Sequence, residues 1–266
     1  MIFCPLISGS TGNATYVAHK TTHILVDCGA SARQIEKLLD SIDVSARDLT
    51  ALLVTHAHRD HINGLGAMSR RYNLPIYASV EAWKEMSHGD KVGRIGQGNI
   101  KVFRRDQPCT LDLGDLEAEF FATPHDAAGS VGYLFRDGSK VAGIATDFGI
   151  VTDAILRALK TCDVALVESN HDVDMLRNGP YPRALQDRIL SMYGHLCNED
   201  AAALAVQLAQ NGARAIYLGH LSQHNNTPNL ALETTREAMI AMQVAPQSDC
   251  RLYVASPVKP CARCEI

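Results

Sequence analysis

The heptapeptide Thr55-His56-Ala57-His58-Arg59-Asp60-His61 directly follows an apolar run, 51–55, that has the length of a buried strand. Two histidines separated by one residue project to the same side of an extended loop. In open α/β sheets, ligands bind beyond the carboxyl ends of the strands. Three imidazoles and one carboxylate at such a position predict a metal site, because an ordinary polar loop rarely gathers four potential ligands in six residues. The predicted ligands in this stretch are His56, His58, Asp60 and His61.

Three further ligand candidates follow later strand patterns at the same position, just past the carboxyl end. His125 follows 116–123, Asp147 follows 140–145 and His220 follows 215–218. A single His or Asp after a strand is usually a turn residue, but three at matching positions predict a site for two divalent ions. Imidazole and carboxylate ligands suit Zn, Mn or Fe. Two such ions activate a shared water for hydrolysis, and Asp60 is a candidate to accept a proton from that water.

The rest of the chain alternates short apolar strands with helices, without a linker that marks a boundary. We therefore expect one domain over 1–266, of α/β class, with two mixed sheets packed together and helices outside. Helices are predicted after Ser31, from 152 to before 163, after Asn198 as N-cap until 211–212, and after Thr227. Strands are predicted at 22–27, 51–55, 75–78, 116–123, 164–168 and 215–218, with a hairpin formed by 131–135 and 140–145, and a last strand at 252–255.

Composition limits the function classes. The formal net charge of −4 argues against a broad basic nucleic-acid face. The basic run is local: segment 80–105 carries Lys84, Lys91, Arg94, Lys101, Arg104 and Arg105, and it is interpreted either as a flap over the site or as a surface insertion. As a flap it would contact phosphates through Arg104 and Arg105. No signal peptide and no membrane span are visible, so a cytoplasmic location without membrane contact is expected.

Cysteine usage indicates a reduced compartment, because the eight cysteines are scattered and several lie in apolar stretches. The polar tail, 256–266, contains Cys261 and Cys264 with CxxC spacing. A structural zinc there needs four ligands, and a second CxxC is missing.

The ligand positions, together with Leu25-Val26-Asp27-Cys28-Gly29, resemble those of the metallo-β-lactamase superfamily over nearly the whole chain. The resemblance implies a four-layer αβ/βα sandwich with two metals at one edge between the sheets. It implies a non-ligating role for Asp27, which orients the His loop. It assigns His56, His58 and His125 to one metal, Asp60, His61 and His220 to the other, and Asp147 to both.

Flanking motifs resemble the YycJ/WalJ/VicX branch of that superfamily, which implies 5′–3′ exonuclease activity with double-stranded DNA as the substrate. These motifs are Ser8-Gly9-Ser10-Thr11-Gly12-Asn13, Glu168-Ser169-Asn170-His171-Asp172, Gly194-His195-Leu196-Cys197-Asn198-Glu199-Asp200 and Gly219-His220-Leu221-Ser222-Gln223-His224-Asn225-Asn226. Cys197 and His224 depart from the pattern beside the predicted site. The candidate substrate-binding residues are Ser8, Ser10, Asn13, Asn170 and Ser222.

Two histidines near these motifs are candidates for acid catalysis. His195 precedes a helix start, where a phosphate is favoured, and His171 follows the strand 164–168. Each is interpreted either as a proton donor to the leaving oxygen or phosphate ligand, or as a hydrogen-bonded structural histidine. The loop 8–13 is likewise either an anion-binding loop or a plain turn.

Competing functions share these ligands. The main alternative is a thioester or lactone hydrolase of the glyoxalase II or lactonase type, which the polar flanks disfavour. RNA processing is disfavoured because no inserted domain fits, and a diiron redox protein because His58 stands where that branch has a carboxylate. A non-catalytic binding module is disfavoured by the complete ligand set. The native metal and the oligomeric state stay open.

Overall fold

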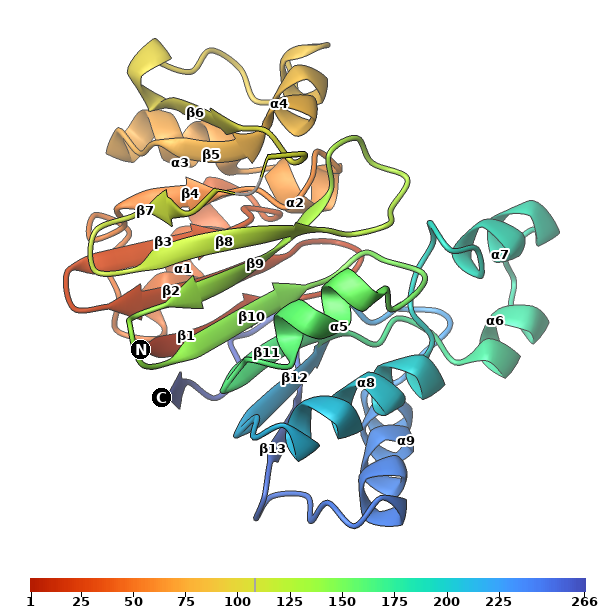
Figure 1. Ribbon diagram of the computed structural model, residues 1–266. Helices are drawn as coiled ribbons and strands as arrows, with labels where there is room; N and C mark the ends of the chain where they lie inside the picture. The colour runs from red at the N-terminus through yellow and green to blue at the C-terminus, as the bar shows by residue number, and fades with distance from the viewer. Residues whose placement is uncertain (108) are drawn as a thin grey trace.

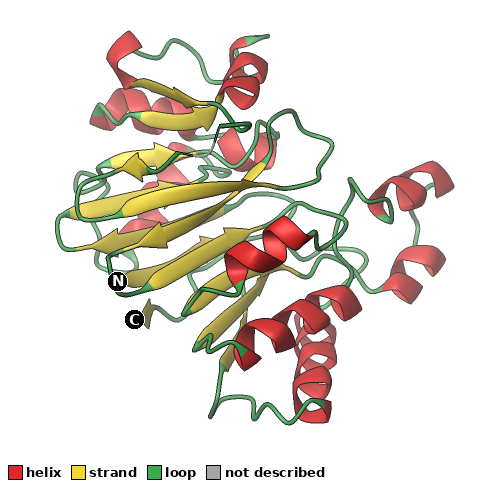
Figure 2. Ribbon diagram, viewed as in Figure 1, coloured by secondary structure: helices red, strands yellow, loops and turns green. Residues whose placement is uncertain are grey.

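Two mixed sheets face each other in a computed structural model that describes residues 1–107 and 109–266. In the described residues each sheet has seven strands, in the orders β14-β1-β2-β3-β4-β5-β6 and β13-β12-β11-β10-β9-β8-β7. Helices cover the outer faces of both sheets (Figure 1, Figure 2). The predicted four-layer sandwich of α/β class with two mixed sheets is confirmed.

The first sheet and its helices come mostly from the N-terminal half. Its strands are β1 (Ile2–Ile7), β2 (Ala14–His19), β3 (Thr22–Val26), β4 (Ala51–Leu53), β5 (Ile76–Ser79), β6 (Ile100–Phe103) and β14 (Cys264–Glu265). Its helices are α1 (Ala32–Asp40), α2 (Arg59–Ile62), α3 (Leu65–Tyr72) and α4 (Val80–Ser87), with a short 3-10 turn, η1 (Gln97–Asn99). Strands β3 to β6 are parallel, whereas β1, β2 and β3 are antiparallel.

The second sheet has the same mixed character. Its strands are β7 (Leu111–Asp112), β8 (Glu117–Ala122), β9 (Val131–Arg136), β10 (Val141–Ala145), β11 (Val164–Glu168), β12 (Ala215–Gly219) and β13 (Arg251–Val254). Its helices are α5 (Asp153–Leu159), α6 (Val173–Asn178), α7 (Arg183–Ile189), α8 (Asn198–Gln210) and α9 (Pro228–Ala241). The predicted hairpin of β9 and β10 is confirmed.

The core between the sheets is built from inward-facing residues of both. Phe3 of β1 packs against Tyr217 of β12, and Tyr133 and Phe135 of β9 are fully buried in the same cluster. Separate apolar clusters join each sheet to its helices. Strands β8, β10, β11 and β12 run in the same direction, so their carboxyl ends lie at one edge, near that of β4.

Two predicted caps are confirmed by the structure and one is wrong. Ser31 caps α1 in a capping box with Gln34, and Thr227 caps α9 with Pro228 in its first turn. Asn198 does not cap α8, because Cys197 occupies the N-cap position. The Asn198 side chain instead points into the core, where Ser169 Oγ donates to its Oδ1 at 2.7 Å.

Segment 80–105 is part of the first sheet at both ends. Helix α4 packs on β5, and β6 extends the sheet beside β5, so the segment is not an insertion that stands apart from the fold. Lys91 of the intervening loop lines a pocket next to His58. Arg104 lies away from that pocket and forms an ion pair with Asp106 at 2.8 Å.

The chain's last residues contribute a further strand, so the expectation that 252–255 is the last one is wrong. Cys264 lies in β14, which pairs with β1. Among the described residues, neither Cys261 nor Cys264 belongs to a group of side chains close enough to hold a metal ion. In the part of the chain that the structure describes, no helix is long and apolar enough to cross a membrane.

Candidate metal centre

The loop after β4 brings His56 and His58 to the edge where β8 ends. The ring centroids of His56, His58 and His125 lie 4.7–5.0 Å apart. Nδ1 of His58 is 3.3 Å from Nε2 of His125. One nitrogen from each of the three rings lies within 4.8 Å of the others. The structure therefore gathers these three predicted ligands around one point.

A second group forms where α2 faces the end of β12. Oδ2 of Asp60 lies 3.5 Å from Nε2 of His61 and 3.5 Å from Nε2 of His220. Asp60 and His61 belong to α2, a single turn that begins directly after His58. The turn directs these two side chains to a different point from the one that His56 and His58 share.

Asp147, just past β10, lies between the two groups. Its Oδ1 is 3.0 Å from Nδ1 of His220 and 3.8 Å from Nε2 of His125, and its Oδ2 is 3.4 Å from Nε2 of His61. All seven predicted ligands thus come together at one edge of the sandwich.

The donor set fits divalent cations. His56 Nε2 and Asp147 Oδ2 are buried and have no hydrogen-bond partner among the described residues. Uncompensated polar atoms are costly in an interior, and a cation would satisfy both. Burial raises the pKa of the Asp147 carboxyl, but the neighbouring His220 and His61 rings outweigh it and hold that pKa well below its ordinary value. The carboxylate is thus ionised and available as a ligand.

Asp27, at the end of β3, holds the His loop. It accepts hydrogen bonds from Thr55 N at 2.9 Å, Thr55 Oγ1 at 2.8 Å and His61 Nδ1 at 2.7 Å. With its proton on Nδ1, His61 presents the lone pair of Nε2 to the site. The contacts agree with the orienting, non-ligating role that the resemblance implies.

Gly29 permits the loop after β3 to pack closely against α2. A Cβ at Gly29 would lie 1.7 Å from the carbonyl oxygen of Asp60 and 2.4 Å from Asn13 N. No larger residue fits without moving the backbone that carries Asp60 and His61.

Glu168, the last residue of β11, belongs to the site although the sequence analysis did not select it. Its Oε1 accepts a hydrogen bond from His195 Nδ1 at 2.6 Å and lies 3.4 Å from His220 Nδ1. Burial opposes the charge, but His195 lowers the pKa of Glu168 to about 2. Burial likewise lowers the pKa of His195, but Glu168 outweighs it and the net shift is upward. Its position at a strand end, like that of Asp147, is the signal that could have identified it.

Three of the five candidate substrate-binding residues form hydrogen bonds that support the site. Ser8 Oγ accepts from His220 N at 2.8 Å and donates to Asn13 Oδ1 at 3.1 Å. Asn13 Nδ2 lies 3.1 Å from His61 Nε2, and Asn170 Nδ2 donates to His220 O at 2.8 Å. Ser8 and Asn13 are buried and are not among the described residues that line the two pockets next to Ser10, so their substrate contact stays a prediction.

The other candidates differ in their exposure. Ser10 is exposed and Ser222 is nearly buried, and both line a pocket together with Asn170 and His195. His171 is buried, and neither ring nitrogen has a hydrogen-bond partner among the described residues. Burial lowers the pKa of His171 to about 4. It is absent from the metal-binding groups and from the lining of the pockets beside them.

Pockets surround the cluster on several sides. One of about 170 Å³ lies beside His195, and another of about 430 Å³ lies between His58, Arg59 and Lys91. A third, of about 330 Å³, lies between Ser10, Arg59 and Asp60. The exposed Arg59 borders two of these pockets.

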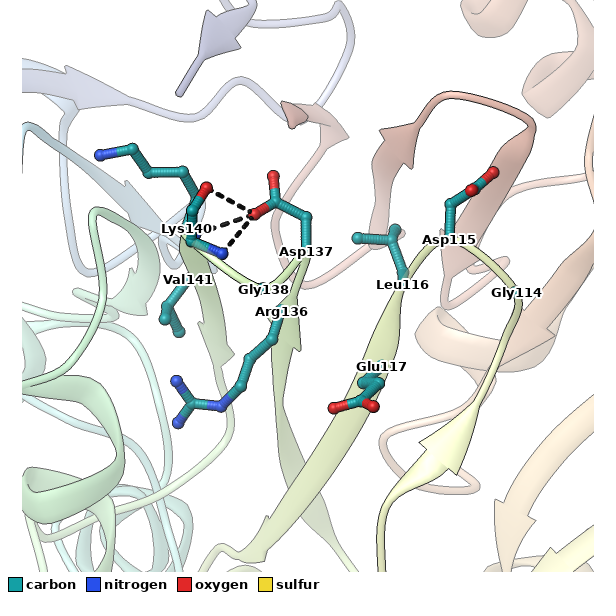
Figure 3. Close-up of a pocket in the computed structure, with 10 residues that line it drawn as sticks. Gly114, Asp115, Leu116, Glu117, Arg136, Asp137, Gly138, Lys140 and Val141 are labelled. Carbon is teal, nitrogen blue, oxygen red and sulfur yellow. Dashed lines mark hydrogen bonds between the residues drawn. The ribbon is translucent and has the colours of Figure 1, made fainter.

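A larger pocket, of about 540 Å³, lies between the β7–β8 and β9–β10 turns (Figure 3). These turns are at the opposite end of β8 from His125. Two of the charged residues that line it form ion pairs: Arg136 with Glu119 at 2.9 Å and Lys140 with Asp163 at 2.7 Å. Asp137 accepts from the backbone N of Lys140 at 2.8 Å. The chemistry therefore belongs to the histidine cluster and not to this pocket.

Comparison with protein families gives a match over most of the chain. The model described as "Beta-lactamase superfamily domain" matches residues 22–221. Exodeoxyribonuclease YycJ of Bacillus anthracis is 41% identical over 229 residues, which cover 86% of this chain and 85% of that protein. Exodeoxyribonuclease WalJ of Streptococcus pneumoniae serotype 2 is 36% identical over 252 residues, which cover 95% of this chain and 93% of that protein.

More distant similarities extend to other hydrolases. Hydroxyacylglutathione hydrolase of Nitrobacter winogradskyi is 29% identical over 119 residues, covering 45% of this chain and 42% of that protein. Among solved structures, the metallo-β-lactamase fold protein YhfI of Bacillus subtilis superposes with a TM-score of 0.69 at 18% identity, covering 98% and 99% of the two chains. This last likeness establishes the fold alone.

Proposed function

This chain belongs to the β-lactamase superfamily, and on that premise we propose that it is a metal-dependent nuclease, a 5′–3′ exonuclease on double-stranded DNA. The observation that carries the proposal is Asp147, which lies against both groups of ligands in a chain 41% identical to an exodeoxyribonuclease. A carboxylate in that position suits two cations held side by side.

In this proposal His56, His58 and His125 would hold one ion, Asp60, His61 and His220 would hold the other, and Asp147 would serve both. Two divalent ions in such a site supply a water nucleophile near neutral pH and offset the charge of a phosphodiester. Imidazole and carboxylate donors suit Zn, Mn or Fe. Asp60, the least buried of the carboxylates in the two ligand groups, is placed to take the proton that the attacking water loses.

His195 is the residue we assign to the leaving group. Oε1 of Glu168 accepts a hydrogen bond from Nδ1 of His195 at 2.6 Å, so Nε2 is the ring nitrogen available to the substrate. The His195 ring packs edge-on against His125 and His220, at centroid distances of 5.4 and 5.2 Å. Because Glu168 favours the charged imidazolium, His195 holds a proton for the leaving oxygen. His171 has no comparable access, and we assign it no step.

The thioester alternative rests on the likeness to hydroxyacylglutathione hydrolase, which covers less than half of either chain. Two relatives that are 36–41% identical over most of the chain are named exodeoxyribonucleases. The surroundings also suit an anionic polymer, because the cationic Arg59 and Arg188 line pockets on different sides of the cluster. These side chains can bind phosphates without contributing to the ligand set.

Degradation of a blunt DNA duplex with one 5′-phosphorylated, 5′-labelled strand tests the proposal. The wild type is loaded with Mn²⁺ and compared with His58→Ala. His88→Ala is the matched control, because His88 is an exposed histidine at the C-terminal end of α4. We expect release of labelled mononucleotide by the wild type and by His88→Ala, and none by His58→Ala. Metal content is measured on all three proteins. A fully metal-loaded wild type that hydrolyses S-lactoylglutathione and leaves DNA intact would favour the thioester alternative.

A further inference from the structure

The pocket beside His195 is lined by residues that are not among the predicted metal ligands. Its volume is about 170 Å³. One wall is apolar and comes from the segment of α6 and α7, which stands beyond the carboxyl ends of the strands at the right of Figure 1. The apolar residues of this wall are Tyr181, Leu185 and Ile189, and the polar lining facing them includes Ser10, Asn170 and Ser222.

Arg188 links this pocket to the metal cluster. Its Nε donates to Oδ2 of Asp126 at 2.5 Å, and Oδ1 of Asp126 lies 3.4 Å from Nε2 of His125 and 3.8 Å from Nε2 of His58. A guanidinium has five N–H donors in a planar fork. Nη2 of Arg188 also contacts Oδ2 of Asp126, and the side chain is 58% exposed. The N–H groups of Nη1 therefore remain for another anion. The wall of the pocket thus holds an arginine that can bind a second anion. Its partner Asp126 is the residue next to the proposed ligand His125.

The pocket is held in place by contacts on both sides. His195 N donates to the carbonyl of Ile189 at 2.9 Å, which ties the end of α7 to the proposed acid. A Cβ at Gly194 would lie 2.2 Å from that same carbonyl oxygen, so only glycine permits the approach. The Tyr181 ring packs edge-on against His224 at 5.8 Å. Because these contacts hold the pocket in shape, little side-chain entropy is lost when a ligand binds.

Size and chemistry together indicate the ligand. Pockets for drug-sized ligands span roughly 300–1,000 Å³, so this one takes a single small unit. An aromatic and apolar wall suits the face of a nucleobase, the remaining guanidinium donors of Arg188 suit a phosphate, and hydroxyl and amide groups suit a sugar. A mononucleotide unit offers all three.

We propose that this pocket binds the 5′-terminal nucleotide of the DNA strand, with Arg188 on its terminal phosphate and the base against Tyr181 and Leu185. Occupation of the pocket places the next phosphodiester at the metal cluster, so the enzyme removes one nucleotide at a time from an end. This inference rests on the proposed function and adds to it the group that recognises the end.

Equilibrium binding of thymidine 5′-monophosphate to the metal-loaded protein tests the pocket without requiring turnover. Loss of a charge-assisted contact on a half-exposed arginine predicts about tenfold weaker binding for Arg188→Ala. Leu185→Trp, which fills the pocket, is expected to weaken binding at least as much. Arg183→Ala is the matched control, because Arg183 lies on the same helix, is 80% exposed and is not among the lining residues. It should bind as the wild type does.

The comparison with thymidine 3′-monophosphate tests which end is bound, and tighter or equal binding of this isomer would overturn the assignment to the 5′ end. Wild-type affinity for the 5′-monophosphate in both Arg188→Ala and Leu185→Trp would mean that the metals alone hold the nucleotide, and the pocket would be rejected.

Degradation kinetics give a second readout. The wild type is expected to prefer duplexes with 5′-phosphate over 5′-hydroxyl ends, and Arg188→Ala to lose that preference through a higher KM. An active Arg188→Ala that keeps the full preference would reject the pocket while the nuclease assignment stands. If the wild type degrades no DNA, the proposed function fails, and the mononucleotide measurement alone then decides whether the pocket binds nucleotides.

Discussion

Asp27→Asn is the substitution whose effect follows most directly from the geometry. Oδ1 of Asp27 accepts from Thr55 N, and Oδ2 accepts from both Thr55 Oγ1 and His61 Nδ1. An asparagine has one oxygen, so its amide NH₂ must face a donor in either orientation. If it faces His61, the ring proton moves to Nε2, and the nitrogen that would ligate metal is blocked.

The expected loss can be bounded from these contacts. Hydrogen bonds to charged groups contribute about 1.5–3 kcal/mol, and loss of a group that orients a metal ligand typically costs about 10–100-fold in metal affinity. We expect a loss of that size at the Asp60, His61 and His220 group. The His56, His58 and His125 group should be affected less, because its link to Asp27 runs only through the Thr55 hydroxyl, 3.1 Å from His56 Nδ1.

Metal stoichiometry in chelator-buffered solution, read by elemental analysis, measures the effect. The wild type should retain two ions per chain at a free-metal level where Asp27→Asn retains one. Asp43→Asn is the control, because Asp43 is exposed and shares the positive φ of Asp27, 59° against 61°. Two ions of wild-type affinity in folded Asp27→Asn would refute the reasoning.

Three further outcomes are expected. Removal of metal by a chelator should abolish DNA degradation and lower the Tm, because ions that bind the folded chain and not the unfolded chain stabilise the fold; an unchanged Tm in scanning calorimetry would contradict this. Gly29→Ala should lower the free energy of unfolding by about 2–3 kcal/mol, because the added methyl group is overpacked against Asp60. This corresponds to a Tm about 5–10 °C lower. Gly96→Ala is the control, because there is open space around Gly96, and it should melt as the wild type does. Arg59→Ala should weaken DNA binding and reduce its salt slope by about 1, and an equal effect of the exposed Arg47→Ala would argue against a specific role.

The sequence was sufficient to predict the ligands because each one lies close after the end of a strand in the sequence. A strand pattern followed by His or Asp marks a position, and the sheet topology alone brings such positions together. Asp147 and His220 are 73 residues apart, yet both follow parallel strands of one sheet, and the structure places their side-chain atoms 3.0 Å apart. The predicted hairpin and two of the helix caps depend on equally local chemistry.

What the sequence did not predict depends on contacts between distant segments. Glu168 ends an apolar strand, and nothing local reveals that His195 would lie against it. Ser8 belongs to a hydroxyl-rich loop that is typical of anion binding, but its hydroxyl accepts from the backbone of His220, 212 residues away. The pocket wall formed by Tyr181 and by Leu185 and Ile189 of α7 was missed because a helix of two turns is too short to show a clear period.

The position of the charges explains how a chain with a net charge of −4 can bind DNA. Besides Asp126, which is paired with Arg188, four carboxylates lie at or beside the cluster: Asp27, Asp60, Asp147 and Glu168. Two divalent ions would carry as much positive charge as these four carry negative charge, so metal binding neutralises the edge of the sandwich. Arg59, which lines pockets beside the cluster, then adds positive charge at this edge. Field strength near a cleft depends on such local charges more than on the total. On this argument metal binding precedes DNA binding, and the −4 charge restricts contact with the polymer to this edge.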